Sequence, residues 1–143
     1  MSESERCVFS EGSVSLPAGY NERTVNVLVA GDEYSPSLTI SRDNARHGEL
    51  LPDYIARQLA VLSGNLKGWV LNRREPVSLG NGQWAGERVD ASYLRDGQRI
   101  WQQQAVFMLQ DSRILVFTLT HNRKLSQQDT TLLRQVLDSY QSA

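Results

Sequence analysis

Short extended segments fill the first third of the chain. Residues 7–9 and 14–16 form two apolar segments, residues 23–30 are rich in β-branched side chains, and residues 37–41 alternate polar and apolar positions. β-branched and alternating runs of this length are typical of strands. The polar stretch 31–35 lies between the last two segments, so we predict that they form a hairpin.

The spacing of apolar residues becomes helical after residue 51. Leucine and isoleucine recur at steps of four, three and four residues, at Ile55, Leu59, Leu62 and Leu66. Pro52 suits the first turn of a helix, where its missing N–H would have no partner in any case. The pattern predicts a helix over residues 52–65.

A second helix is predicted near the C-terminus. Ser126 followed by Asp129 resembles a capping box, with aspartate in place of the longer acid. One helical face is apolar and consists of Leu132, Leu133, Val136, Leu137 and Tyr140.

Between the two predicted helices the chain is again extended. Residues 69–74, 87–94, 99–109 and 113–120 are predicted strands. The pairs Asp96-Gly97 and Asp111-Ser112 are turn signals, and Gly80-Asn81-Gly82 suits a hairpin tip. We therefore predict an α+β fold, with one antiparallel sheet of about seven strands packed with two main helices in a single domain over residues 1–143.

The register of the late strands predicts which side chains share a face. A two-residue turn at Asp96-Gly97 sets Ala91 opposite Gln102, and it likewise pairs Val89 with Gln104 and Tyr93 with Ile100. Continuing through a two-residue turn at Asp111-Ser112 adds Val106, Met108, Leu115, Phe117 and Leu119 to this face. The opposite face would then carry Trp101, Ala105, Phe107, Leu109, Ile114 and Val116.

Both faces of the predicted sheet are apolar. An antiparallel sheet usually leaves one face to water, so two apolar faces imply either a helix on each face or a surface reserved for a partner. The sequence leaves both alternatives open. Gln102 and Gln104 favour a partner surface, because buried amides need hydrogen-bond partners that a ligand could supply.

Composition and charge exclude several classes of protein. Fifteen basic and sixteen acidic residues give a net charge of −1, without the basic stripe that a nucleic-acid binder needs. Residues 1–6 lack a basic segment followed by an apolar one, and no apolar run could span a bilayer. We therefore expect a cytoplasmic protein that binds no nucleic acid and does not insert into membranes.

No catalytic constellation emerges from the residues. The only histidines, His47 and His121, lie in loop-like contexts without a second metal ligand at a suitable spacing, and the single cysteine, Cys7, lies in a polar stretch. Asp43 and Glu49, near two arginines, are interpreted as solvated charges. We expect no enzyme activity, no cofactor and no metal site.

Three short stretches follow one another along the chain, namely TVNVL at residues 24–28, IARQL at 55–59 and REPV at 74–77. In these stretches the chain resembles the DcrB-like domain family and, more narrowly, the Eag-type chaperones of bacterial type VI secretion. The resemblance implies a PsbP-like fold and a homodimer. It also implies a client, namely an effector toxin with a PAAR domain whose N-terminal transmembrane segments the chaperone keeps soluble before export.

The resemblance and the predicted register together suggest where a client would bind. Val25 and Val27 lie in the first matching stretch and Gln58 in the second, which places a groove between helix 52–65 and one sheet face. The amides of Gln58 and Gln102 and the hydroxyl of Ser37 would bond to polar groups of the client. The predicted client-binding residues are Val25, Val27, Ser37, Thr39, Gln58, Leu62, Ala91, Gln102, Gln104 and Val106.

Other interpretations remain open at this point. Each of these residues could equally serve ordinary core packing. The protein could also be a non-catalytic module that binds a soluble partner, a carrier of a small hydrophobic ligand, or an enzyme whose site the sequence does not reveal.

Overall fold

The computed structural model describes residues 5–143, so part of the N-terminal stretch considered above, residues 1–4, lies outside the described residues. The elements follow in the order β1 (Arg6–Phe9), β2 (Gly12–Ser15), β3 (Asn26–Leu28), β4 (Ser37–Asn44), α1 (Leu51–Asn65), β5 (Val70–Leu79), β6 (Trp84–Arg95), β7 (Gln98–Met108), the 3-10 turn η1 (Gln110–Ser112), β8 (Arg113–His121) and α2 (Gln127–Asp138). The α+β class is confirmed. The helix predicted over 52–65 begins one residue earlier and ends where expected.

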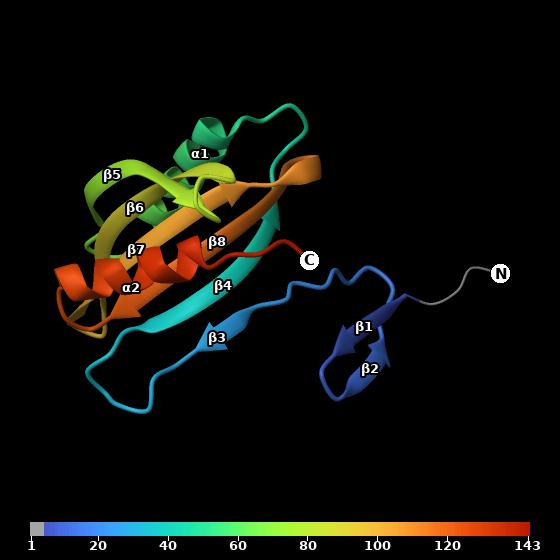
Figure 1. Cartoon of the computed structure of the whole chain (residues 1–143), viewed down its shortest axis with the longest axis horizontal. Helices are drawn as coiled ribbons and strands as arrows, with labels where there is room; N and C mark the ends of the chain where they lie inside the picture. Colours follow the sequence, from blue (N-terminus) through green and yellow to red (C-terminus); the bar gives the residue numbers. More distant parts are fainter. Residues whose placement is uncertain (1–4) are drawn as a thin grey trace.

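The strands form two sheets instead of the predicted single one. β3-β4-β8-β7-β6-β5 is a six-stranded antiparallel sheet, whereas β1 and β2 pair only with each other. The exposed segment 17–25 separates this N-terminal hairpin from β3, and Figure 1 shows the hairpin standing clear of the main sheet. β3 is also shorter than the predicted strand over 23–30.

The turn between β6 and β7 matches its prediction. Asp96 and Gly97 both adopt positive φ, at 51° and 79°, as a tight two-residue hairpin turn requires. The pairing of Ala91 with Gln102 and of Val89 with Gln104 follows, as predicted.

The predicted pairing register between β7 and β8 is wrong by one residue. Beyond the end of β7, the Leu109 N–H still donates a 2.7 Å hydrogen bond to the Arg113 carbonyl, so the loop that this bond closes holds three residues, Gln110–Ser112, instead of the predicted two. Because side chains alternate along a strand, one extra loop residue moves every β8 side chain to the other face. Val106 therefore pairs with Val116, and the α2-side face carries Leu115, Phe117 and Leu119.

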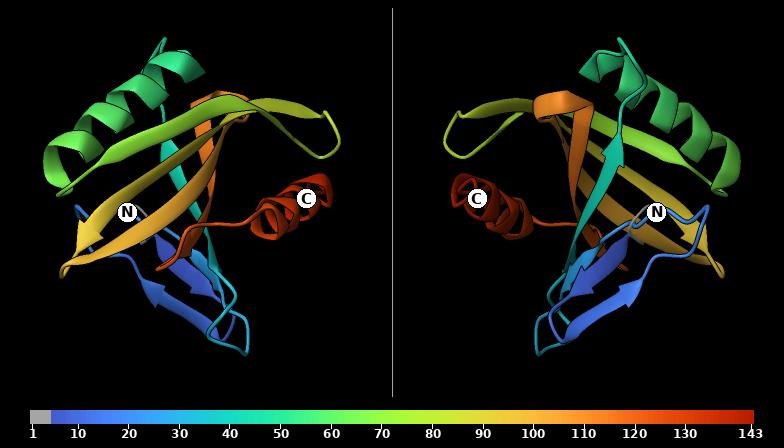
Figure 2. Two further views of the ribbon diagram at one scale, coloured as in Figure 1. Left: turned by 90° about the vertical axis from the view of Figure 1, so that its left-hand side faces the viewer. Right: turned by 90° about the vertical axis from the view of Figure 1, so that its right-hand side faces the viewer.

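One helix covers each face of the six-stranded sheet, as Figure 2 shows. On one face α2 packs over a core of Leu38, Leu79, Ala105, Phe107, Phe117, Leu119, Leu133 and Leu137. On the other, α1 contributes to a smaller core of Tyr54, Ile55, Val89, Val106 and Ile114. The α1 face is thus covered by a smaller buried cluster than the α2 face.

The predicted capping box starts α2. The Ser126 side chain accepts a 3.3 Å hydrogen bond from the Asp129 N–H, and the Asp129 carboxylate accepts one of 2.7 Å from the Ser126 N–H. Leu133 and Leu137 are buried beneath this helix as expected, while Leu132, assigned to the same apolar face, is 42% exposed.

Candidate functional site

A groove of about 320 Å³ lies between α1 and the adjoining sheet face, and we call it the α1 groove. Its helix wall consists of Tyr54, Ile55, Gln58, Leu59 and Leu62. Its floor and far side consist of Val89, Gln104, Val106, Val116, Thr118, Ser41, Arg42, Asp43, Arg23 and Val25. Five predicted residues line it directly, namely Val25, Gln58, Leu62, Gln104 and Val106.

The other predicted residues extend the floor of the groove across the same sheet face. One row of paired residues runs through Val27, Thr39, Thr118, Gln104 and Val89. The next row runs through Ser37, Thr120, Gln102 and Ala91. Because paired residues share a face, all the strand residues predicted for the site lie on the α1 side.

Exposure divides these residues into two kinds. Val25 and Val27 are 51% and 61% exposed, so their side chains are open to a ligand. Ala91 and Val106 are only 3% and 5% exposed and contribute mainly to packing within the protein. The α1 face is therefore closed near the helix and open toward β3.

A polar track crosses the open part of the floor. The Gln104 Nε2 donates to Gln102 Oε1 at 3.0 Å, and the Gln102 Nε2 donates to Thr120 Oγ1 at 3.4 Å. All three residues are half-buried. Within residues 5–143, the neighbouring hydroxyls of Ser37, Thr39 and Thr118 make no side-chain hydrogen bond, so they remain able to donate or accept.

Gln58 faces this floor from the helix. Its side chain is half-buried and lines the α1 groove beside Leu62. Among the described residues its amide has no hydrogen-bond partner. The Gln58 amide is thus free to form hydrogen bonds with a ligand, whereas the Gln102 amide already bonds to Gln104 and Thr120.

The end of the α1 groove near the start of α1 is held by polar contacts. The Tyr54 hydroxyl donates to Asp43 Oδ2 at 2.7 Å, and Arg23 approaches the same carboxylate at 3.9 Å. Burial raises the pKa of Tyr54, and the bond to Asp43 raises that pKa further. Tyr54 therefore stays protonated and keeps α1 attached to β4.

A second contact fixes the first turns of α1 to the preceding loop. The Arg57 guanidinium donates to both oxygens of Glu49 at 2.8 and 2.9 Å and lies 5.2 Å from the centre of the Tyr54 ring. The hydrogen bonds from Arg57, with one from the Arg46 N–H, lower the pKa of Glu49 to about 2. The interpretation of Asp43 and Glu49 as solvated charges is wrong, because both carboxylates are paired.

The sequence argument missed the contribution of β8 to the site. Val116, Thr118 and Thr120 lie on the α1 face beside the glutamines. The error in the β7–β8 turn had placed the opposite set of β8 residues there. The alternation of Phe117 and Leu119 with two threonines was the available signal, since the polar set continues the polar track.

The histidines form no site with other ligands. His121 ends β8 instead of lying in a loop, and its ring nitrogens lie 2.9 Å from the Tyr34 carbonyl and 2.8 Å from Asn122 Oδ1. In the part of the chain that the structure describes, no group of three His, Cys, Asp or Glu side chains is arranged to hold a metal ion. No helix within residues 5–143 is long and apolar enough to cross a bilayer.

Comparison with known families and proteins agrees with this arrangement. The family model described as DcrB matches residues 11–139, nearly the whole chain. The chain belongs to the DcrB family. A Pseudomonas aeruginosa protein named Effector EagT6 is 27% identical over 113 residues, which cover 77% of this chain and 76% of that protein.

A solved structure with a TM-score of 0.70 shows the same fold, and a second aligns more loosely. A Pseudomonas aeruginosa protein of unknown function, PA94, described as a putative regulator, aligns with a TM-score of 0.70 and 21% identity over 99% of both chains. The PsbP protein of Synechocystis (CyanoP) aligns with a TM-score of 0.45 and 9% identity over 94% of this chain and 87% of that one.

Proposed function

We propose that this DcrB-family protein is a cytoplasmic chaperone that binds the N-terminal transmembrane segments of a type VI secretion effector with a PAAR domain. The observation that carries the proposal is the α1 groove, in which an apolar helix–sheet junction continues into a track of amides and hydroxyls. The similarity to the protein named Effector EagT6 supports an association with an effector.

The composition of the groove suits an apolar helix as ligand. Each Å² of apolar client surface removed from water contributes roughly 25 cal/mol, so burial would provide most of the affinity. Val25, Val27 and Leu62 offer such a surface. Gln58 and the hydroxyls of Ser37 and Thr39 can bond to polar side chains of the client, as small polar residues do between membrane helices.

The size of the groove argues for two copies of the chaperone. An α-helix with its side chains is about 10–12 Å across, and a membrane-spanning helix is about 30 Å long. A groove of about 320 Å³ accommodates only a few side chains of such a helix. We therefore propose a homodimer in which two α1 faces enclose the client.

The remaining alternatives are less well supported by the groove. A carrier of a small ligand usually encloses most of its cargo, whereas this groove opens toward the exposed residues of β3. An enzyme would need converging ionisable groups without other partners, whereas those at the groove are already paired. Tyr54 bonds to Asp43, Arg23 lies 3.9 Å from the same carboxylate, and Arg42 bonds to Asn26.

Co-expression of the tagged protein with the effector encoded beside its gene tests the proposal. We expect the full-length effector and a fragment with only its N-terminal transmembrane segments and PAAR domain to co-purify. An effector that lacks the transmembrane segments should be lost, because its apolar ligand surface is gone. Retention of the toxin domain alone would instead favour a module for a soluble partner and would contradict the proposal.

A further inference from the structure

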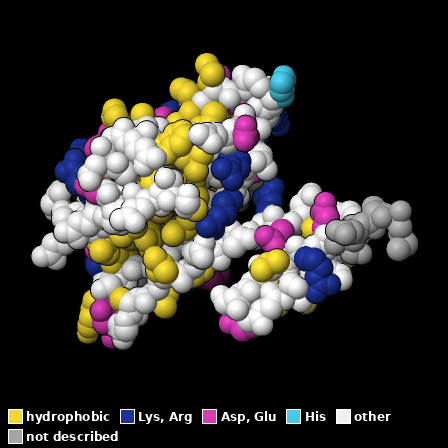
Figure 3. Space-filling model, turned by 45° about the vertical axis from the view of Figure 1, so that its right-hand side comes forward, with side chains coloured by type: hydrophobic (Ala, Val, Ile, Leu, Met, Phe, Trp, Pro, Cys, Tyr) yellow, Lys and Arg dark blue, Asp and Glu magenta, His cyan; other side chains and the backbone are white. Residues whose placement is uncertain are grey.

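The N-terminal hairpin of β1 and β2 leaves most of its surface in solvent. The residues of its two strands are exposed except for the partly buried Cys7, and Val8, Phe9 and Val14 are 73%, 46% and 53% exposed. Figure 1 shows the hairpin beyond the end of the main sheet, and Figure 3 shows hydrophobic side chains on it, apart from those gathered on the body. An isolated two-stranded hairpin is marginally stable in water, so this one needs a surface to pack on.

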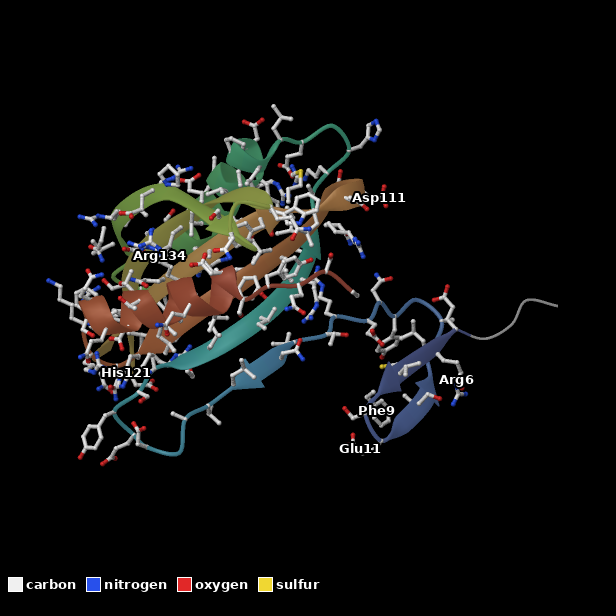
Figure 4. All side chains as sticks on the ribbon, viewed as in Figure 1. Arg6, Phe9, Glu11, Asp111, His121 and Arg134 are labelled. Atoms are coloured by element: carbon white, nitrogen blue, oxygen red, sulfur yellow. The ribbon has the colours of Figure 1, made fainter. Side chains whose placement is uncertain are left out.

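The two faces of the hairpin differ in chemistry. Arg6 pairs with Ser15, and its guanidinium donates to the side chains of Ser13 and Ser15, which makes that face polar. Cys7 pairs with Val14, so the alternating residues Phe9, Val14 and Leu16 lie on the other face. Figure 4 draws Arg6 and Phe9 on opposite sides of the hairpin. The hairpin is therefore amphipathic, with an apolar face that is not covered.

The end of the main sheet nearest the hairpin also has an incomplete surface. A gap of about 1220 Å³ separates the base of the hairpin from the sheet end. Most residues that line this gap are polar or charged, such as Gln110 and Arg113, but its lining also includes the partly exposed apolar residues Trp84, Leu109, Leu115 and Tyr140. The hairpin residues at this gap are Glu5, Arg6 and Leu16, while Phe9 and Val14 do not line it. Within residues 5–143 the buried Trp84 Nε1 has no acceptor. The hairpin thus fails to cover the sheet end of its own chain.

We propose that the hairpin is an exchanged arm, whose apolar face packs on the sheet end around Trp84 and Leu109 of a second copy of this chain. Each copy both provides a hairpin and receives one, so a single two-fold dimer covers both incomplete surfaces and closes on itself. The exposed segment 17–25 can span up to roughly 30 Å when extended, which allows the hairpin to reach a neighbouring copy.

This contact rests on the proposed function, in which two α1 faces enclose the client, and goes beyond it by naming the contact that holds the two copies together. A second copy fits better than a client segment as the occupant, because exchange covers the hairpin and the sheet end at the same time. The hairpin also lies outside the α1 groove, whose lining includes none of its residues.

Paired substitutions on the two hairpin faces test the exchange in the absence of a client. We expect the variant with Phe9→Ser and Val14→Ser to dimerise at least roughly tenfold more weakly than the parent in sedimentation equilibrium, because the apolar contact is lost twice in a two-fold dimer. The control Val8→Ser alters the polar face and should leave dimerisation unchanged. A parent protein that is only monomeric at micromolar concentration, or equal dimerisation of all three proteins, overturns the proposal.

The single cysteine allows a direct test of which chain the hairpin touches. Cys7 in the full chain is coupled to a maleimide–benzophenone and mixed with isotope-labelled Cys7→Ser protein before irradiation. We expect mixed cross-linked dimers whose peptides contain Trp84, Leu109 or Tyr140 of the labelled copy. Cross-links confined to one chain overturn the exchange. Because the proposed function needs two copies, the weakly dimerising Phe9→Ser and Val14→Ser variant should also retain less effector. A parent protein that retains the effector while its cross-links stay within one chain overturns the exchange alone, so the two proposals fail separately.

Discussion

Neighbouring glutamines of β7 have different surroundings although they are adjacent in sequence. Gln102 and Gln104 are half-buried on the α1 face and bond to each other, whereas Gln103 points to the α2 face, is 6% exposed and donates to Thr130 at 2.8 Å. A glutamine contributes to client binding only where its amide is accessible. At the residue scale, the accessible candidates are therefore Gln58 on α1 and both Gln102 and Gln104 on the sheet.

Replacing the amides of Gln58 and Gln102 together separates a role in client binding from a structural role. We expect the double variant Gln58→Leu and Gln102→Leu to keep a melting temperature within a few degrees of the parent, since Gln58 has no partner in residues 5–143 and water can replace Gln102 at the half-buried Gln104. The same variant should accumulate markedly less full-length effector in cells, because unshielded transmembrane segments aggregate or are degraded.

The exposed Gln135 on α2 provides the matched control for this experiment. Gln135→Leu makes the same chemical change on the other side of the sheet, and effector accumulation should not change. A sharp fall in melting temperature of the double variant with normal effector accumulation would show that the amides are structural and that the client binds elsewhere.

The lowered pKa of Glu49 predicts that the protein becomes less stable as the pH falls below about 4.5. Its pKa of about 2 in the folded protein lies below the ordinary 4.5, so the unfolded chain binds the proton more readily. The stabilisation by the pair with Arg57 is therefore fully present above about pH 4.5 and is lost as the pH falls toward 2. We expect Glu49→Gln to unfold at lower urea than the parent at pH 7, and this difference should shrink between pH 4.5 and 2.

The exposed Glu33 serves as the control for this titration. Glu33→Gln removes one negative charge without removing a contact, so its midpoint should follow that of the parent at every pH. A constant difference between Glu49→Gln and the parent from pH 7 to pH 2 would refute the assignment of the pH dependence to Glu49.

At the scale of elements, a glycine allows β6 and β7 to meet closely. Gly86 pairs with Phe107, and a Cβ at Gly86 would lie 2.4 Å from both the Phe107 ring and the Val106 carbonyl oxygen. Phe107 is fully buried in the α2-side core and cannot move away easily. β6 and β7 can therefore pack this closely only because residue 86 is a glycine.

Alanine substitutions at two glycines should have opposite effects. We expect Gly86→Ala to lower the free energy of unfolding by about 1–3 kcal/mol, since the added methyl group overpacks the core. Gly64→Ala in α1 meets no atom within 4 Å and should stabilise the protein by up to about 1 kcal/mol, because alanine favours the helix. Urea unfolding of the two variants measures both effects, and a Gly86→Ala variant as stable as the parent would contradict the close packing.

At the scale of the whole molecule, the two sheet faces have separate roles. α2 and its capping box close one face over the larger core, while α1 leaves the other face open toward β3. The N-terminal hairpin lies outside both cores. Client binding at the α1 groove and arm exchange at the sheet end therefore use different surfaces. Groove variants should leave dimerisation unaffected, whereas loss of the dimer should also weaken client binding.

Local patterns were enough to predict the parts of the fold that depend on neighbouring residues. The apolar spacing from Ile55 to Leu62 predicted α1, because side chains three and four residues apart share a helix face. Asp96 and Gly97 accept positive φ, so they set the β6–β7 register and placed Gln102 beside Ala91. The sequence therefore placed Gln102, Gln104 and Val106 together on one sheet face, but only the structure shows that α1 packs on that face.

Two features of the fold depend on loop conformation and on contacts between distant residues, so only the tertiary structure revealed them: the register of β8 and the separation of the N-terminal hairpin. Asp111 and Ser112 both adopt φ of 59° within a three-residue loop, and that extra residue determines which β8 side chains face α1. The separation of the β1–β2 hairpin from the main sheet likewise depends on a pairing across the chain that no local pattern encodes. A periodic sequence specifies which residues share a face, but only the assembled sheet determines which face is covered and which stays open.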